Sequence, residues 1–167
     1  MISRVFTVVF LACVLAVPAA AQQTVFLVRH AERADSSPGT SPTMAADPDL
    51  SEAGRARAEH LAEALKDAKI TAIFATEFKR TQQTAAPLAK ALGVTVKIVT
   101  SKNDASLIAD LKAAKGNVLV VGHSNTVPEI IKRLGVTTAV AIGDDDFDNL
   151  FIVGTGTRPS LVRLHYR

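Results

Sequence analysis

Two histidines follow short apolar segments at the points where strands of a sheet would end. His30 stands after the apolar run 24–28, with Arg29 directly before it, and His123 comes shortly after the apolar run 117–121. In an open parallel sheet, the ligand crevice lies outside the carboxyl ends of the strands. A lone histidine is more often structural. Two histidines at equivalent strand ends, with an arginine beside one of them, indicate a binding or catalytic site.

A second arginine, Arg80, lies in the first turn of an amphipathic helix that follows the apolar run 71–75. Its guanidinium group can reach the same crevice, where the amino terminus of the helix also favours an anion. Arg29 and Arg80 could each offer a planar fork of donors to phosphate oxygens. The alternative for Arg80 is an exposed surface position like that of neighbouring Lys79.

Three segments of the chain resemble motifs of the histidine phosphatase superfamily, which has the phosphoglycerate mutase-like fold. They are Phe26–Glu32 (FLVRHAE), Arg80–Ala85 (RTQQTA) and Val121–Ser124 (VGHS). The motifs stand in the family's order and the resemblance spans most of the chain after residue 21. It implies that His30 is the phosphorylated nucleophile and that Arg29, Arg80 and His123 form the phosphate and substrate pocket.

Phosphoryl transfer needs an in-line nucleophile and neutralisation of the charge on the equatorial oxygens. The attacking nitrogen of His30 must be unprotonated, so we expect its other ring nitrogen to donate to a backbone carbonyl. Arg29, Arg80 and His123 would neutralise the phosphoryl charge. Because these donors replace a metal ion, we expect activity without a divalent cation or other cofactor. Water would then hydrolyse phospho-His30.

No acid of the chain stands in a motif that marks it as the proton donor for the leaving group. Many family members follow the second histidine with aspartate, but this chain has Ser124 there. The other large branch of the family takes its acid from the segment between the second helix and the later histidine, so the resemblance implies Asp104, the best-placed loop carboxylate there, as the general acid. The alternative is that Asp104 caps the following helix. Glu32 is a further candidate for substrate binding or for orienting a neighbour, whereas Glu77 is expected to be a solvated surface acid.

The family's common R-H-G-E is R-H-A-E here, and the chain lacks room for the insertions that mutases use, so we expect a phosphatase. Its substrates would be phosphomonoesters or phosphohistidine. One alternative is a non-catalytic module of the same fold that binds a phosphorylated ligand. Another is a metal hydrolase that uses His30, His123 and acids of the 144–148 loop, although no metal-ligand spacing supports it. We expect that acidic loop to be exposed to solvent, because its acidic residues lack the spacing of a calcium-binding loop.

Short apolar runs alternate with amphipathic stretches from residue 24 onward, which predicts a three-layer α/β sandwich with a mostly parallel central sheet. We expect strands at 24–28, 71–75, 95–99, 117–121, 150–153 and 161–165. We expect helices after Ser51, from about residue 78 to 92, at 104–114 and at 127–134. Pro87 should kink or break the second helix. Loops at 35–48 and 136–149 should shape specificity.

The composition fits one compact domain behind a leader. The chain has 167 residues, 48% hydrophobic, with 19 Lys+Arg against 16 Asp+Glu, which excludes disordered and collagen-like classes. Residues 1–21 read as a signal peptide cleaved after Ala21, leaving a histidine phosphatase-like domain at 22–167, and a retained membrane anchor is the alternative. Cleavage would remove Cys13, the only cysteine, and would leave no stable anchor.

These features place the protein in the periplasm or outside the cell. Its basic residues are interspersed with acids, so no nucleic-acid partner is expected. The expected partner is a small phosphorylated substrate, bound by a monomer or a homodimer.

Overall fold

The computed structural model describes residues 23–36, 47–102 and 104–167. The leader expected at 1–21 lies outside these ranges. The backbone of Asp104 is described, but its side chain is not. Within the described ranges, no helix is long and apolar enough to span a membrane.

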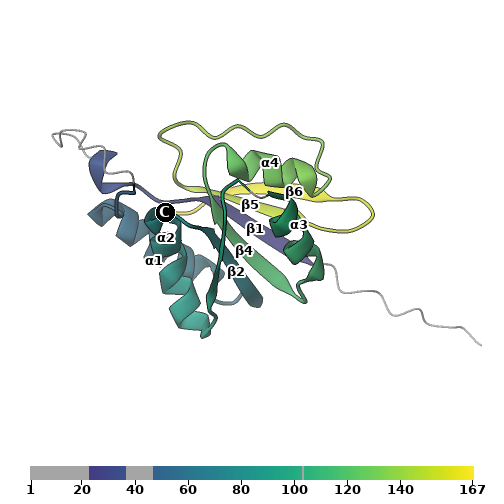
Figure 1. Ribbon diagram of the computed structural model, residues 1–167, viewed down its shortest axis with the longest axis horizontal. Coiled ribbons are helices and arrows are strands. Elements are labelled where there is room, and N and C mark those ends of the chain that lie inside the picture. The colour runs from purple at the N-terminus through teal and green to yellow at the C-terminus, as the bar shows by residue number, and fades with distance from the viewer. Residues whose placement is uncertain (1–22, 37–46, 103) are drawn as a thin grey trace, which may run out of the picture.

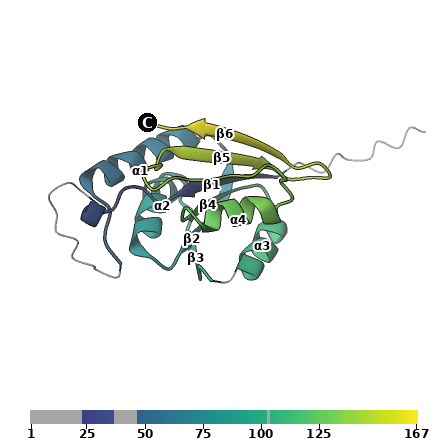
Figure 2. The same cartoon turned by 90° about the horizontal axis from the view of Figure 1, so that it is seen from above.

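The centre of the molecule is a six-stranded mixed sheet in the order β3-β2-β4-β1-β5-β6. Its strands are β1 (Thr24–Arg29), β2 (Ile70–Thr76), β3 (Val96–Val99), β4 (Asn117–Gly122), β5 (Asn149–Gly154) and β6 (Ser160–His165). The pairs β1/β4, β2/β4 and β2/β3 are parallel, whereas β5 and β6 add as antiparallel strands at one edge. Figure 2 shows β6 and β3 at opposite edges. The predicted fold class, with a mostly parallel sheet, is confirmed.

Helices cover both faces of this sheet (Figure 1). They are α1 (Glu52–Leu65), α2 (Lys79–Leu92), α3 (Asp104–Ala113) and α4 (Thr126–Arg133), together with a 3-10 turn, η1 (Ala34–Ser36). Alternate residues of β1 point to opposite faces, so Phe26 and Val28 pack with α1 and α2, whereas Val25 and Leu27 pack with α3 and α4. The central strands β1, β2 and β4 are therefore buried on both sides, which explains their continuous apolar runs.

The signals for the ends of the helices are largely as expected. Ser51 precedes α1, and its hydroxyl accepts a hydrogen bond from the N–H of Gly54 at 3.0 Å. Gly93 ends α2 in the left-handed conformation, with φ 65°. The break expected at Pro87 is wrong, because α2 is one helix from residue 79 to 92. The buried face on either side of Pro87 (Ala85, Leu88 and Ala89) packs on the sheet and holds the helix together across the missing hydrogen bond.

Candidate active site

His30 directly follows β1, at the carboxyl end of that strand. Its N–H donates to the carbonyl of Gly122 at 2.9 Å, which continues the pairing of β1 with β4. The Nδ1 atom lies 2.8 Å from the carbonyl oxygen of Ala31. Because a carbonyl only accepts, Nδ1 carries the hydrogen and Nε2 keeps its lone pair. This is the protonation state that nucleophilic attack by Nε2 requires.

His123 follows β4, the strand beside β1, and its ring faces that of His30. The two ring centroids are 5.3 Å apart with an interplanar angle of 65°. His123 Nε2 lies 2.9 Å from the hydroxyl of Thr76, the last residue of β2. Three adjacent strand ends thus supply the two histidines and the group that orients one of them.

The two predicted arginines flank this pair, and each guanidinium lies on a phenylalanine ring. The Cζ atom of Arg29 is 4.2 Å from the centroid of Phe147, and that of Arg80 is 4.3 Å from the centroid of Phe78. In both arginines Nε is buried and has no hydrogen-bond partner among the described residues. Buried donors without partners are costly, so these two N–H groups fit an anion bound between the arginines.

The electrostatics around the two histidines favour an anion as well. Burial, together with the nearby His123 and both arginines, lowers the pKa of His30 to about 3, despite the opposing hydrogen bond to Ala31. Burial and Arg80 lower the pKa of His123 to about 4. Burial also lowers the pKa of each arginine. Both histidines are therefore neutral at physiological pH, and the positive charge of the crevice comes from the arginines.

The loop after α4 is part of this site, although its acidic sequence predicted only solvated residues. Arg29 Nη1 donates to the carbonyls of Gly143 and Asp144, at 2.7 Å each. The ring of Phe147 lies under Arg29 and 6.1 Å from the His30 ring. The loop thus contributes backbone oxygens and an aromatic ring, and the charges of Asp144, Asp145 and Asp146 act on Arg29, where they oppose the effect of burial on its pKa. Nothing in its composition shows those contacts, because they depend on how the loop folds back over β1.

A third arginine, Arg33, also lies near the crevice and was missed in the sequence. Its charge is among the causes that lower the pKa of both Arg29 and Arg80. The backbone of Arg33 forms an isolated antiparallel β-bridge with that of Leu50. Its side chain forms an ion pair with Asp35, whose Oδ1 is 3.1 Å from Arg33 Nε. No motif marks Arg33, and only its place after the R-H-A-E segment could have suggested it.

The amino terminus of α2 is occupied by a carboxylate of the chain itself. The backbone N–H of Lys79 donates to both oxygens of Asp47, at 2.9 and 3.1 Å. The same carboxylate lies 3.7 Å from Arg80 Nη1. We predicted that backbone amides at this helix end would bind the ligand's phosphate. The amide of Lys79 does not fit this prediction, because it already donates to Asp47.

The candidate acids Glu32 and Glu77 form hydrogen bonds with residues outside the cluster of histidines and arginines. Glu32 accepts hydrogen bonds from Arg57 on α1, at 2.6 to 2.9 Å, and these bonds outweigh burial and lower its pKa. Glu77 is exposed, as predicted, but is not simply solvated: it accepts bonds from the backbone and hydroxyl of Ser101, at 2.8 and 2.9 Å. Among the described residues no hydrogen bond or ion pair joins Glu32 to either histidine, and Asp104 begins α3 with its side chain outside the described part. The roles proposed for Glu32 and Asp104 stay predictions.

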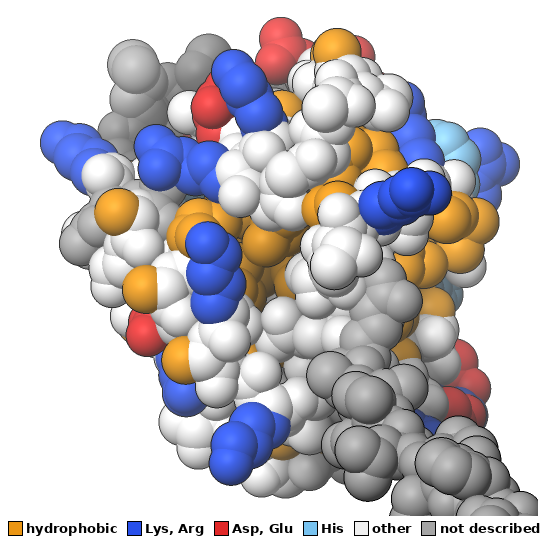
Figure 3. All heavy atoms as spheres, turned by 90° about the vertical axis from the view of Figure 1, so that its right-hand side faces the viewer, with side chains coloured by type: hydrophobic (Ala, Val, Ile, Leu, Met, Phe, Trp, Pro, Cys, Tyr) orange, Lys and Arg blue, Asp and Glu red, His pale blue; other side chains and the backbone are white. Residues whose placement is uncertain are grey.

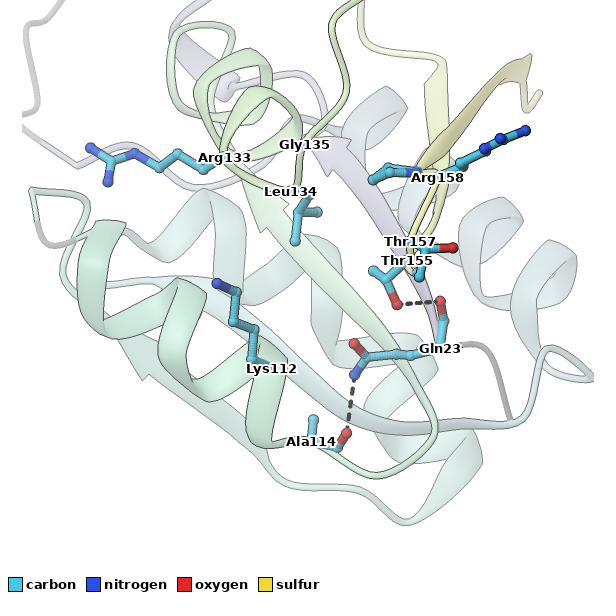
Figure 4. A pocket seen from close by; sticks show the side chains of 11 residues that line it. Gln23, Lys112, Ala114, Arg133, Leu134, Gly135, Thr155, Thr157 and Arg158 are labelled. Atoms are coloured by element: carbon cyan, nitrogen blue, oxygen red, sulfur yellow. Dashed lines mark hydrogen bonds between the residues drawn. The ribbon is translucent and has the colours of Figure 1, made fainter. Parts of the chain in front are cut away.

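A cavity of about 1030 Å³ lies at the opposite end of the sheet, beside Gln23, which precedes β1. Figure 3 shows this side of the molecule, with scattered Lys and Arg around an apolar hollow. In Figure 4, Gln23 bonds to Ala114 and Thr155, and Arg133 and Arg158 extend outward on opposite sides. The cavity is separate from the chemistry at His30. Among the described residues, no group of three or more His, Cys, Asp or Glu side chains could hold a metal ion.

The fold and the paired histidines and arginines define a class of protein that binds phosphate at the carboxyl ends of a parallel sheet. Residues 25–103 match the family model of the histidine phosphatase superfamily, branch 1. Over these residues the chain is similar to this superfamily, as its motifs indicated, and the match supports a histidine-type phosphatase, a hydrolase acting on phosphate esters. His30, Arg29 and Arg80 lie within the matched residues, whereas His123 lies beyond them. None of the curated proteins matches the chain significantly.

Solved structures of similar fold cover most of the chain. A protein of Agrobacterium tumefaciens assigned as the phosphohistidine phosphatase SixA is 23% identical, with a TM-score of 0.62 over 84% of this chain and 97% of its own. A protein of Escherichia coli assigned as an alpha-ribazole-5'-P phosphatase is 17% identical, with a TM-score of 0.69 over 86% and 96%. A mycobacterial glucosyl-3-phosphoglycerate phosphatase in complex with VO3 is 17% identical, with a TM-score of 0.67 over 86% and 99%. At these identities the likeness establishes the fold.

Proposed function

We propose that this protein is an exported, metal-independent phosphatase that hydrolyses small phosphomonoesters through a phosphohistidine on His30. The observation that carries the proposal is the state of His30: Nδ1 is bonded to the Ala31 carbonyl, and Nε2 keeps its lone pair beside His123. The buried, unpartnered Nε atoms of Arg29 and Arg80 support it, because a phosphoryl group would satisfy them.

The reaction would proceed in two steps. His30 Nε2 attacks phosphorus while the two arginines hold the equatorial oxygens, and the bond to the leaving group breaks. Water then attacks phospho-His30, releasing phosphate and restoring the imidazole. Because the guanidinium groups neutralise the phosphoryl charge, no step calls for a divalent cation.

Export rests on the sequence of residues 1–21, and substrate choice rests on the compartment. An exported enzyme would meet phosphomonoesters, such as sugar phosphates, more readily than phosphohistidine proteins. One structural neighbour is assigned as a phosphohistidine phosphatase and another is a glucosyl-3-phosphoglycerate phosphatase, whose substrate is a phosphomonoester. A substrate screen should therefore include both classes.

The test is hydrolysis of p-nitrophenyl phosphate by the purified protein, with and without a chelator. We expect chelator-resistant turnover that His30→Ala abolishes, and a phosphoenzyme that can be trapped in the wild type but not in this variant. Arg80→Ala should lower kcat/KM by about 10²-fold or more, because it removes a donor to the transition state. Lys79→Ala is the matched control and should change it less than about threefold, because Lys79 is exposed.

Other outcomes would decide against the proposal. Phosphate or vanadate binding without turnover of any substrate screened would favour the non-catalytic binding module. Activity that a chelator removes and a divalent cation restores would contradict the metal-independent mechanism. Turnover that survives His30→Ala would exclude the phosphohistidine intermediate.

A further inference from the structure

A chain of buried hydroxyl groups leads from α2 to the ring of His123. The Thr81 hydroxyl lies 2.7 Å from the carbonyl oxygen of Phe78 and 3.0 Å from that of Thr76. It also lies 2.9 Å from the Thr76 hydroxyl, which is in turn 2.9 Å from His123 Nε2. Thr81 is fully buried and Thr76 is 5% exposed, so no solvent competes for these bonds.

The directions of these hydrogen bonds follow from the number of hydrogens available. A threonine hydroxyl has a single hydrogen, and a carbonyl can only accept. If Thr81 donates to Phe78, then Thr76 donates to Thr81, and His123 Nε2 donates to Thr76, which makes three bonds. The reverse direction makes two bonds and leaves the short contact between Thr81 and Phe78 without its hydrogen. The three-bond arrangement is favoured because buried donors and acceptors are costly to leave unpaired.

Neutral His123 is then protonated on Nε2 and carries a lone pair on Nδ1. No described residue makes a hydrogen bond with this Nδ1. The His123 ring stands edge-on both to the His30 ring, at 5.3 Å, and to the Phe78 ring, at 5.2 Å. A lone pair beside a phosphoryl oxygen is unfavourable unless a proton lies between the two atoms.

From this geometry we propose that Thr81 and Thr76 fix the tautomer of His123 so that its Nδ1 carries the proton that the leaving group receives. The inference rests on the proposed function and deepens it. It names His123 as the proton donor in a chain with Ser124 where many relatives have an aspartate. Thr76 and Thr81 are positioning residues, which act through His123.

The proton balance of the reaction is complete with these groups. The substrate enters as a monoanion, and its phosphoryl O–H gives its proton to His123 Nδ1. His30 Nε2 forms a bond to phosphorus, the P–O bond to the leaving group breaks, and the leaving oxygen takes the proton from Nδ1. In the second step the oxygen of water bonds to phosphorus, the N–P bond breaks, and Nδ1 accepts a proton from the water. Nδ1 then gives this proton to the departing phosphate, which leaves as the monoanion and restores neutral His123.

The charged groups around His123 are compatible with this cycle. Arg80 from α2 and Arg29 from β1 lower its pKa, whereas Glu77, between β2 and α2, raises it. His30, from the end of β1, is the remaining titratable group packed against the ring. The free site therefore holds His123 neutral, and a bound phosphoryl anion would offset the arginines and favour the protonated form.

The kinetic test compares two substrates, p-nitrophenyl phosphate and phenyl phosphate, because phenolate is the poorer leaving group and depends more on a proton donor. His123→Gln should lower kcat for phenyl phosphate by about 10²-fold or more, and for p-nitrophenyl phosphate by about tenfold. Thr76→Val and Thr81→Val should show the same pattern to a smaller extent and shift the pH profile of kcat. Thr76→Ser should restore wild-type behaviour. Thr95→Val is the control, because Thr95 is exposed.

Equal losses on both substrates would overturn the proposal, since a merely structural role affects both alike. A pH profile that Thr76→Val leaves unchanged would also overturn it. The tautomer itself is measured without turnover by 15N NMR of the labelled protein. His123 protonated on Nε2 would support the assignment, and a neutral ring protonated on Nδ1 would refute it. If the wild type hydrolyses no phosphate ester, the proposed function fails, and the NMR result still decides the tautomer.

Discussion

At the scale of single residues, the site is built from side chains whose pKa values are lower than in water. His30 and His123 are buried, at 5% and 9% exposure, and lie beside two arginines. Burial disfavours the imidazolium, and the arginines disfavour it further. A nucleophile that must be unprotonated is thus kept so well below neutral pH, and the same arginines that would bind phosphate are responsible for part of the effect.

This arrangement predicts how stability depends on pH. The folded pKa values of His30 and His123, about 3 and about 4, are below the unfolded value of 6.5. The unfolded chain therefore binds more protons below pH 6.5, so the free energy of unfolding should fall as the pH falls from 6.5 towards 4. Each histidine contributes at most about 1.4 kcal/mol per pH unit. Urea denaturation at pH 7.5, 6.5 and 5.5 measures the slope.

The control for this prediction is the double variant His30→Gln, His123→Gln. Glutamine does not titrate, so the slope between pH 6.5 and 5.5 should flatten in the double variant. An equally steep slope in wild type and variant would assign the pH dependence to other groups. Above pH 6.5 the two proteins should show the same pH dependence.

At the scale of elements, the start of α1 is pressed against the segment that follows His30. A Cβ atom placed on Gly54 would lie 2.2 Å from the carbonyl oxygen of Glu32 and 3.0 Å from its nitrogen. The carbonyl of Glu32 also accepts the N–H of Ser51 at 2.9 Å. Only glycine allows this approach, which fixes the backbone two residues after the nucleophile.

We therefore expect Gly54→Ala to destabilise the protein by about 3 kcal/mol, because both backbone segments must move. In an unconstrained helix the same change would stabilise by about 1 kcal/mol, so the sign is diagnostic. Thermal or urea unfolding measures it, and kcat should fall as well. A gain in stability would mean that α1 can shift without disturbing β1.

The second prediction at this scale concerns Pro87, which lies inside α2. Proline removes one backbone hydrogen bond and disfavours the helix by about 3 kcal/mol relative to alanine. Part of this cost is offset because proline also restricts the unfolded chain. Pro87→Ala should therefore raise the free energy of unfolding by about 1–2 kcal/mol in urea titrations. Activity should hold, since Arg80 lies at the other end of the helix, and a loss of stability would show that the ring's packing dominates.

The elements also show what the sequence could predict. All six strands and four helices were expected close to their observed positions, because strands buried on two faces leave apolar runs and helices on a sheet leave stripes. The start of α1 was predicted from Ser51, and the end of α2 was predicted from Gly93. The break at Pro87 was wrong, because packing on the sheet outweighs the local preference of proline.

The site was predictable to the extent that its residues stand at the ends of elements. Arg29, His30, Arg80 and His123 occupy such positions, and the structure brings all four together. Phe147 reaches the site only through long-range folding. Thr81 stands in the RTQQTA segment, but the contact of Thr76 with His123 depends on the pairing of β2 with β4, which no local pattern shows. The roles of Asp104 and Glu32 stay predictions, because element ends alone do not show where their carboxylates point.

At the scale of the whole molecule, the C-terminal residues join three distant parts of the chain near the site. Tyr166 is 5% exposed and packs into the core on the α1 and α2 side of the sheet. Its hydroxyl donates to the carbonyl of Phe147 at 3.2 Å, and its backbone N–H donates to that of Asp148 at 2.9 Å. Its own carbonyl accepts from Arg57 at 3.4 Å. Tyr166 thus ties the loop that supports Arg29 to the helix that holds Glu32.

This connection predicts an effect on substrate binding from a residue that carries no chemistry. Tyr166→Phe keeps the ring but removes the hydroxyl, which should cost about 1 kcal/mol of stability and loosen the loop around Phe147. Because that loop orients Arg29, KM for p-nitrophenyl phosphate should rise several-fold while kcat changes little. Val162→Ala on the edge strand β6 is the control, since Val162 is 50% exposed. An unchanged KM in Tyr166→Phe, with stability lowered as expected, would show that the loop holds Arg29 without help from the chain end, and that the site depends on β1 and the 143–148 backbone alone.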